Sequence, residues 1–245
     1  DVERGVILQE IGQTLDTPDD IVFDWLQETA YPEQSLGRSI LGPSENISRF
    51  SRDDLSTFVS EHYSPDRMIL SAAGGVNHET LCKLAEKAFG DLKKPTLLKE
   101  PTAAAFAGGE FRKDKKLEQA HFALAFESPS YRSLDIYTAQ VYSIALGGGM
   151  SSRLFQQIRE KRGLCYSIFA QAGAFSDTGL TTIYAGTSAE QIPDLANLTV
   201  NELKRAAMDL SEVEVTRARS QMKAGLLMGL ESPSSRAERL ARMIQ

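Results

Sequence analysis

Cysteine is scarce in this chain, which has only Cys82 and Cys165 among its 245 residues. So few cysteines exclude a disulfide framework and favour a reducing compartment. Positive charge is not in excess either, because the formal net charge is −6 and no basic stripe indicates a nucleic-acid surface. No apolar run approaches the roughly 20 residues that a membrane span needs. We therefore expect a globular protein with no nucleic-acid partner and no membrane span.

Motifs that hold metals or nucleotides are missing as well. The three histidines, His62, His78 and His121, are far apart in the sequence, so neither H-E-x-x-H nor H-x-x-E-H is present. The glycines of "GGGMSSRLF" at 147–155 lack the G-K-[ST] ending of a P-loop and are contiguous, unlike those of a dinucleotide fingerprint. We interpret the histidines as surface or locally hydrogen-bonded residues. The glycine run indicates a helix end with a flexible turn, and a gating role is the alternative.

Helical and extended patterns alternate irregularly along the chain. Spacing of apolar residues and capping signals predict helices over 1–17, 19–31, 52–63, 78–92, 134–149, 151–163, 189–208, 211–230 and 233–245. Strands are predicted at 68–76, 118–128 and on both sides of a turn at 176–179. Hairpins within such an order favour the α+β class over a doubly wound sheet.

The domain organisation follows from a change of composition in the middle of the chain. The stretch "KKPTLLKEPTAAAFAGG" at 93–109 combines prolines with small residues, as interdomain linkers do. We predict two similar units, each a mainly antiparallel sheet with helices packed on one face: residues 1–98, a linker at 99–110, and residues 111–245. Both ends lie within helical patterns without a cap, so we expect a fragment truncated at both ends.

Two carboxylates near the start, Glu3 and Glu10, are seven residues apart. On a helix this spacing places them on one face, roughly 10 Å apart. One could then bind a metal while the other supports it. The plainer interpretation is that both are solvated surface residues.

A second pair of chemically capable residues lies in "IREKRGLCYS" at 158–167. Arg159 offers a rigid fork of donors, and the Tyr166 hydroxyl can polarise a carbonyl group or stabilise an oxyanion. A structural arginine and a half-buried tyrosine remain the simpler interpretation. Cys165 has no histidine beside it in the sequence, so we expect a buried, inert thiol.

Three segments together resemble one family. The segment "ERGVILQEI" at 3–11 is similar to the helix that follows the zinc motif in the pitrilysin/insulinase metallopeptidases. Residues 31–76, "YPEQSLGRSILGP" and onward, resemble their processing-peptidase branch, in its β-type subunit or bacterial single-chain relatives. Residues 146–188, beginning "LGGGMSSRLF", resemble its second-domain signature.

The resemblance implies roles for four residues. Glu10 matches the downstream zinc ligand and Glu3 matches the acid that supports it. Arg159 and Tyr166 match the R-x6-Y pair that binds substrate and stabilises the transition state from the second domain. It also implies zinc as cofactor, an extended peptide or presequence as substrate, a homodimeric or heterodimeric full-length protein, and a bacterial cytoplasmic or mitochondrial matrix location.

The inverted zinc motif H-x-x-E-H, however, is absent from the chain. We therefore expect a portion of a zinc endopeptidase that is itself inactive and free of zinc, since one carboxylate does not make a zinc site. The alternative is a non-catalytic partner subunit similar to respiratory-complex core proteins. Such members often lose the ligand or R/Y residues, and the presence of all four favours the peptidase.

Overall fold

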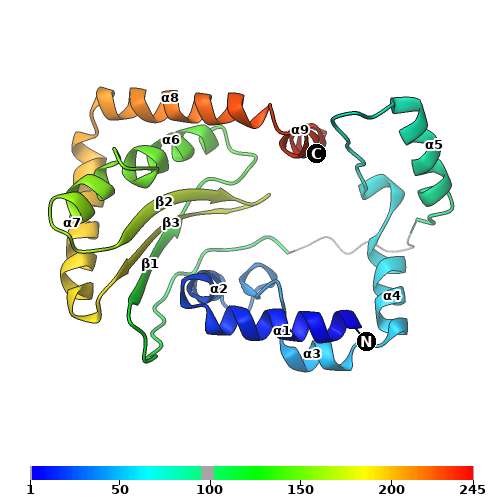
Figure 1. Cartoon of the computed structure of the whole chain (residues 1–245), viewed down its shortest axis with the longest axis horizontal. Coiled ribbons are helices and arrows are strands. Elements are labelled where there is room, and N and C mark those ends of the chain that lie inside the picture. The colour runs from blue at the N-terminus through cyan, green and yellow to red at the C-terminus, as the bar shows by residue number, and fades with distance from the viewer. Residues whose placement is uncertain (1, 95–101, 245) are drawn as a thin grey trace. The chain divides into compact units, whose positions relative to one another are not determined.

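The computed structural model describes residues 2–94 and 102–244 (Figure 1). Packing divides the chain into two compact units. The first unit comprises residues 1–48 and 102–222, and the second comprises residues 49–101 and 223–245.

The first unit contains a sheet and the helices around it. Its helical elements are α1 (Val2–Asp16), α2 (Pro18–Ala30), η1 (Ser35–Gly37), most of α3 (Ser44–Arg49), α6 (Ile136–Gly147), η3 (Phe155–Glu160), η4 (Ala189–Gln191), α7 (Ile192–Asp209) and the first part of α8 (Glu212–Gly229). Its strands are β1 (Ala120–Glu127), β2 (Ser167–Ala174) and β3 (Gly179–Thr187).

The sheet is antiparallel throughout, in the order β1-β3-β2. The strands β2 and β3 form a hairpin whose turn is closed by the Phe175 amide, which donates to the Thr178 carbonyl at 2.8 Å. Every residue of the central strand β3 is buried. Because β3 has a neighbour on each side and helices on both faces, it forms the centre of the unit.

The two faces of the sheet carry different layers, since side chains alternate along a strand. One face presents Ile183 and Ala185 to a core shared with η3, α6 and α7. On the other face, Phe23 of α2 has its ring centroid 6.1 Å from Phe169 and 5.4 Å from Tyr184. Figure 1 shows the sheet between α6 and α2. Helix α1 packs outside this layer, against α2.

The second unit consists of helices joined by irregular segments. They are α4 (Arg52–His62), η2 (Pro65–Arg67), α5 (His78–Phe89), the end of α8 and α9 (Pro233–Arg242). Its helices begin at the signals that the sequence contains, such as the capping box of Ser51 with Asp54 and the Asn77 cap of α5. Of the residues described in this unit, Ser64 alone is buried.

The α+β class predicted from the sequence is confirmed, as are most helices and the strands 120–127, 167–174 and 179–187. The strand predicted at 68–76 is wrong: this apolar segment is irregular, with Leu70 and Val76 exposed. A strand is stable only when neighbours complete its hydrogen bonds, and no strand of the described residues pairs with it.

Two further predictions concern the helix over 151–163 and the domain boundaries. The helix expected over 151–163 is shorter, and residues 155–160 form a π-helical turn. The predicted domains, 1–98 and 111–245, stay a prediction. The two compact units are defined by contacts between residues, and such contacts do not test where one homologous domain ends and the next begins. Residues 99–101 of the predicted linker at 99–110 lie outside the described residues.

Candidate functional site

Arg159 and Tyr166 lie on either side of the turn that leads from η3 into β2. The Arg159 side chain is exposed and its guanidinium carbon lies 4.6 Å from the centroid of the Phe155 ring. Tyr166 is 67% exposed, although its amide donates to the Gly186 carbonyl at 2.9 Å and is thereby attached to β3. Both polar side chains are thus open to solvent on backbone that is held in place.

The turn between the two residues has a defined backbone. Gly163 has φ +61, a left-handed conformation that glycine adopts without strain. Its amide donates to the Arg159 carbonyl at 2.9 Å, and the Leu164 amide donates to the Ile158 carbonyl at 3.2 Å. Since Ile158 is fully buried, the turn is anchored in the core.

Cys165 lies directly before Tyr166 and is buried. Burial raises the pKa of its thiol to about 11, although the positive charge of Arg159 opposes part of this rise. A thiol of this kind stays protonated at neutral pH and is a poor nucleophile. The structure agrees with the inert thiol expected from the sequence.

Glu3 and Glu10 both project from α1 into solvent. The helix packs against α2, and Ile11 is its buried residue. Among residues 2–94 and 102–244, no three histidine, cysteine, aspartate or glutamate side chains cluster so that they could hold a metal ion. The described residues therefore do not fit a complete zinc site, and the zinc roles of Glu10 and Glu3 stay predictions.

The three histidines make local contacts, as the sequence suggested. His62 stacks on Phe58 with ring centroids 4.2 Å apart. His78 has its Nε2 3.5 Å from the Cys82 sulfur on the same helix. The Nδ1 of His121 lies 2.9 Å from the Tyr184 hydroxyl.

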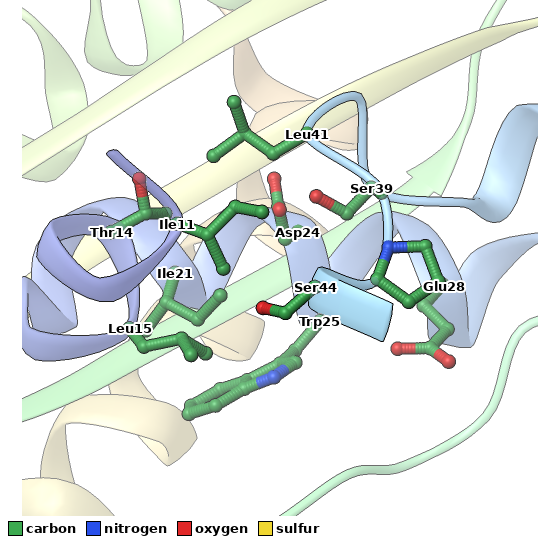
Figure 2. A pocket seen from close by; sticks show the side chains of 12 residues that line it. Ile11, Thr14, Leu15, Ile21, Asp24, Trp25, Glu28, Ser39, Leu41 and Ser44 are labelled. Atoms are coloured by element: carbon green, nitrogen blue, oxygen red, sulfur yellow. The ribbon is translucent and has the colours of Figure 1, made fainter. Parts of the chain in front are cut away.

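A pocket of about 260 Å³ lies between α1, α2 and the loop 39–44 (Figure 2). Asp24 and Glu28 of α2 contribute carboxylates, Trp25 contributes an aromatic ring, and Ile11 and Leu15 of α1 add apolar surface. Carboxylates beside apolar surface suit a side chain with an aliphatic stem and a positive end. The sequence pattern alone does not reveal this pocket. The i, i+4 spacing of Asp24 and Glu28 was visible, but the wall formed by the loop was not.

The glycine segment after α6 is held by side chains from α8. Gln221 donates to the Gly148 carbonyl at 2.6 Å, and Arg217 donates to the Ser151 carbonyl at 3.0 Å. Gly147 is required by packing, because a Cβ there would lie 2.3 Å from the Ala170 nitrogen. This segment is the junction between α6, β2 and α8, and the geometry supports the helix-end interpretation.

Comparisons with known proteins give consistent matches. A protein-family model described as the peptidase M16 inactive domain matches residues 49–222. A protein of Rickettsia bellii described as an uncharacterized zinc protease is 39% identical over 241 residues, which are 98% of this chain and 58% of that relative. The mitochondrial-processing peptidase subunit beta of Blastocladiella emersonii is 37% identical over 253 residues, which are 100% of this chain and 54% of that protein.

The fold also matches a solved structure. A chain of complex III2 from Candida albicans has a TM-score of 0.86 at 24% identity, over 97% of this chain and 59% of that chain. At this identity the match shows the fold alone. The present chain spans little more than half of the curated relatives it matches. No helix of the described residues is long and apolar enough to cross a membrane.

Proposed function

The chain belongs to the family of the peptidase M16 inactive domain, and from this premise we propose that it is part of a zinc-dependent endopeptidase. The full-length protein cleaves extended peptides or presequences in a chamber between two homologous domains. The observation that carries the proposal is the exposed Arg159–Tyr166 pair on its anchored turn. Relatives described as zinc proteases support it.

Arg159 and Tyr166 bind and orient the peptide in this proposal. The guanidinium of Arg159 donates paired hydrogen bonds to backbone carbonyl or carboxylate oxygens of the peptide. The Tyr166 hydroxyl donates to the scissile carbonyl oxygen, where negative charge develops during hydrolysis. Both side chains carry the N–H or O–H donors that these roles require.

Glu10 is the zinc ligand that this chain contributes, and Glu3 supports it. A catalytic zinc has three protein ligands, so a single carboxylate leaves the ion without its remaining partners. We therefore propose that the 245-residue chain by itself binds no zinc and is inactive. The metal belongs to the full-length protein, which supplies the histidines.

The acidic pocket adds a preference among peptides. Asp24 and Glu28 attract a lysine or arginine side chain of the substrate, while Trp25 and the apolar lining accept its aliphatic stem. The full-length protein works as a homodimer or a heterodimer, in the bacterial cytoplasm or the mitochondrial matrix.

The test uses the full-length protein, with zinc measured by elemental analysis and cleavage measured on an unstructured peptide. Glu10→Gln should remove zinc and activity together. Tyr166→Phe should keep zinc and lower kcat about 100-fold, as loss of an oxyanion donor does. Tyr137→Phe is the matched control, because Tyr137 is also 67% exposed and has no assigned role. Activity unchanged in both Tyr166→Phe and Glu10→Gln would refute the site.

The alternative function is a non-catalytic partner subunit. It is favoured only by the fold shared with the complex III2 chain. A full-length protein with neither zinc nor peptidase activity, isolated in a stable complex with another subunit, would establish this alternative.

A further inference from the structure

We propose that Thr187 is the positioning residue that sets the geometry of Tyr166 relative to Arg159. The inference rests on the proposed function, since it concerns how the same pair is held. Thr187 is the last residue of β3 and is fully buried. It acts through the backbone between Arg159 and Tyr166.

The contact that carries the inference is a side-chain hydrogen bond across the turn. The Thr187 hydroxyl donates to the Leu164 carbonyl, which belongs to the residue two positions before Tyr166. The preceding residue of β3, Gly186, accepts from the Tyr166 amide at 2.9 Å. Adjacent residues of one buried strand therefore hold the backbone on both sides of Cys165.

The other end of the turn is held by different bonds. Leu164 donates to the Ile158 carbonyl at 3.2 Å, and Gly163 donates to the Arg159 carbonyl at 2.9 Å. Leu164 is thus bonded to η3 through its amide and to β3 through its carbonyl. Removal of the Thr187 hydroxyl leaves the part-buried Leu164 carbonyl without this partner, and loss of a hydrogen-bond partner at a carbonyl shielded from water is costly. The turn then shifts until the carbonyl meets another donor. As a result, the side chains of Arg159 and Tyr166 leave their original relative positions.

A second acceptor lies near the hydroxyl. The side-chain amide oxygen of Gln191 is 3.3 Å from Thr187 Oγ1 and accepts from the Ser188 hydroxyl at 3.4 Å. The Thr187 hydroxyl has one proton, and its contact with the Leu164 carbonyl is the shorter of the two. The proton is therefore assigned to the Leu164 carbonyl.

The experiment compares isosteric substitutions in the full-length protein. Thr187→Val keeps shape and removes the hydroxyl, whereas Thr187→Ser keeps the hydroxyl. Thr199→Val is the matched control, because Thr199 is also fully buried and its hydroxyl donates to the Leu195 carbonyl at 2.8 Å, within α7. We expect Thr187→Val to lower kcat about tenfold with KM changed less than about twofold, since small misplacement of reacting groups acts on the chemical step. Thr187→Ser and Thr199→Val should stay close to the parent.

A double substitution separates positioning from general destabilisation. In a Tyr166→Phe background, Thr187→Val should lower kcat by less than about twofold, because the group that it positions is already gone. An undiminished tenfold loss in that background would overturn the inference. So would equal losses in Thr187→Val and Thr199→Val.

A readout without catalysis distinguishes this inference from the proposed function. Hydrogen exchange of the amides of Leu164 and Tyr166 should accelerate in Thr187→Val and not in Thr199→Val. If the full-length protein cleaves no peptide, the proposed function fails. Unchanged exchange in Thr187→Val then overturns the positioning role as well. Accelerated exchange in a protein that cleaves no peptide would show that Thr187 anchors the turn, and would overturn only its role in catalysis.

Discussion

The two units differ in what stabilises them. In the first unit, a fully buried central strand lies between helical layers, and Leu146, Leu154, Ile158, Ile183 and Leu195 have no exposed surface. In the second unit, the described apolar side chains remain largely exposed, including Phe58 at 54% and Leu84 at 59%. Its helices carry caps and turns but bury almost nothing. One unit is stabilised by packing and the other by local bonds.

This difference shows which energies are available to each unit. Burial of a large aliphatic side chain contributes about 1.5–3 kcal/mol, whereas a helix cap contributes about 1 kcal/mol. Isolated helices shorter than about 12–15 residues are marginal in water, and α4 has 11 residues. The buried core of the first unit can therefore hold a rigid site. Arg159 and Tyr166 lie in this unit.

The largest predicted effect compares one aliphatic residue in each unit. Ile183→Ala removes a side chain with no exposed surface from the central strand, and should lower the free energy of unfolding by about 2–5 kcal/mol. Leu84→Ala, at a site 59% exposed, should lower it by no more than about 0.5 kcal/mol. Urea unfolding of the chain, followed by circular dichroism, measures both.

Equal losses would contradict the contrast between the units. They would show that Leu84 is covered in solution. Because Leu84 lies on α5, its burial would mean that α5 packs on a surface that the structure does not describe.

Local signals in the sequence were enough to predict most elements. Ser51 with Asp54 and Ser211 with Glu214 form the capping bonds expected of helix starts. The failure at 68–76 has a physical cause, because an apolar run shows that a segment is suited to burial but not whether strands exist to pair with it. Sequence pattern therefore predicted the helices of the second unit better than its packing.

The candidate site was predictable to a smaller extent. Arg159 and Tyr166 came from the family resemblance, since their local pattern also suits ordinary surface residues. The pocket at Asp24 depends on the loop 39–44 meeting α2, and the hydroxyl of Thr187 reaches a carbonyl 23 residues earlier in the chain. Contacts between residues far apart in the chain produce no periodic pattern in the sequence.

The second prediction compares ion pairs. In the first unit, Glu214 accepts from Arg153 at 2.8 and 2.9 Å, and the Arg153 side chain is only 8% exposed. Glu214→Gln should lower the free energy of unfolding by about 1–3 kcal/mol, because a nearly buried arginine loses a charged partner. Glu238→Gln breaks an exposed pair with Arg242 in the second unit and should cost less than about 0.5 kcal/mol.

The same pair predicts a pH dependence. Hydrogen bonds from Arg153 lower the pKa of Glu214 from 4.5 to about 2, with further help from Ser211. The folded state therefore binds a proton less readily than the unfolded state, and the stabilisation is present above pH 4.5 and lost as the pH falls towards 2. Unfolding curves of the parent and Glu214→Gln should converge over that range. Curves that stay parallel would show that the Glu214 charge contributes nothing.

The smallest predicted effect concerns one hydroxyl group in each unit. Tyr31 is fully buried, and its hydroxyl lies 3.1 Å from Thr178 Oγ1, in the turn between β2 and β3. Tyr31→Phe should lower the free energy of unfolding by about 1 kcal/mol, because the Thr178 hydroxyl loses a buried partner that water cannot replace. Tyr63 of the second unit is 48% exposed, so water takes the place of its hydroxyl and Tyr63→Phe should change nothing measurable. Thermal unfolding of both variants measures the difference, and a larger loss in Tyr63→Phe would mean that the second unit has a polar core of its own.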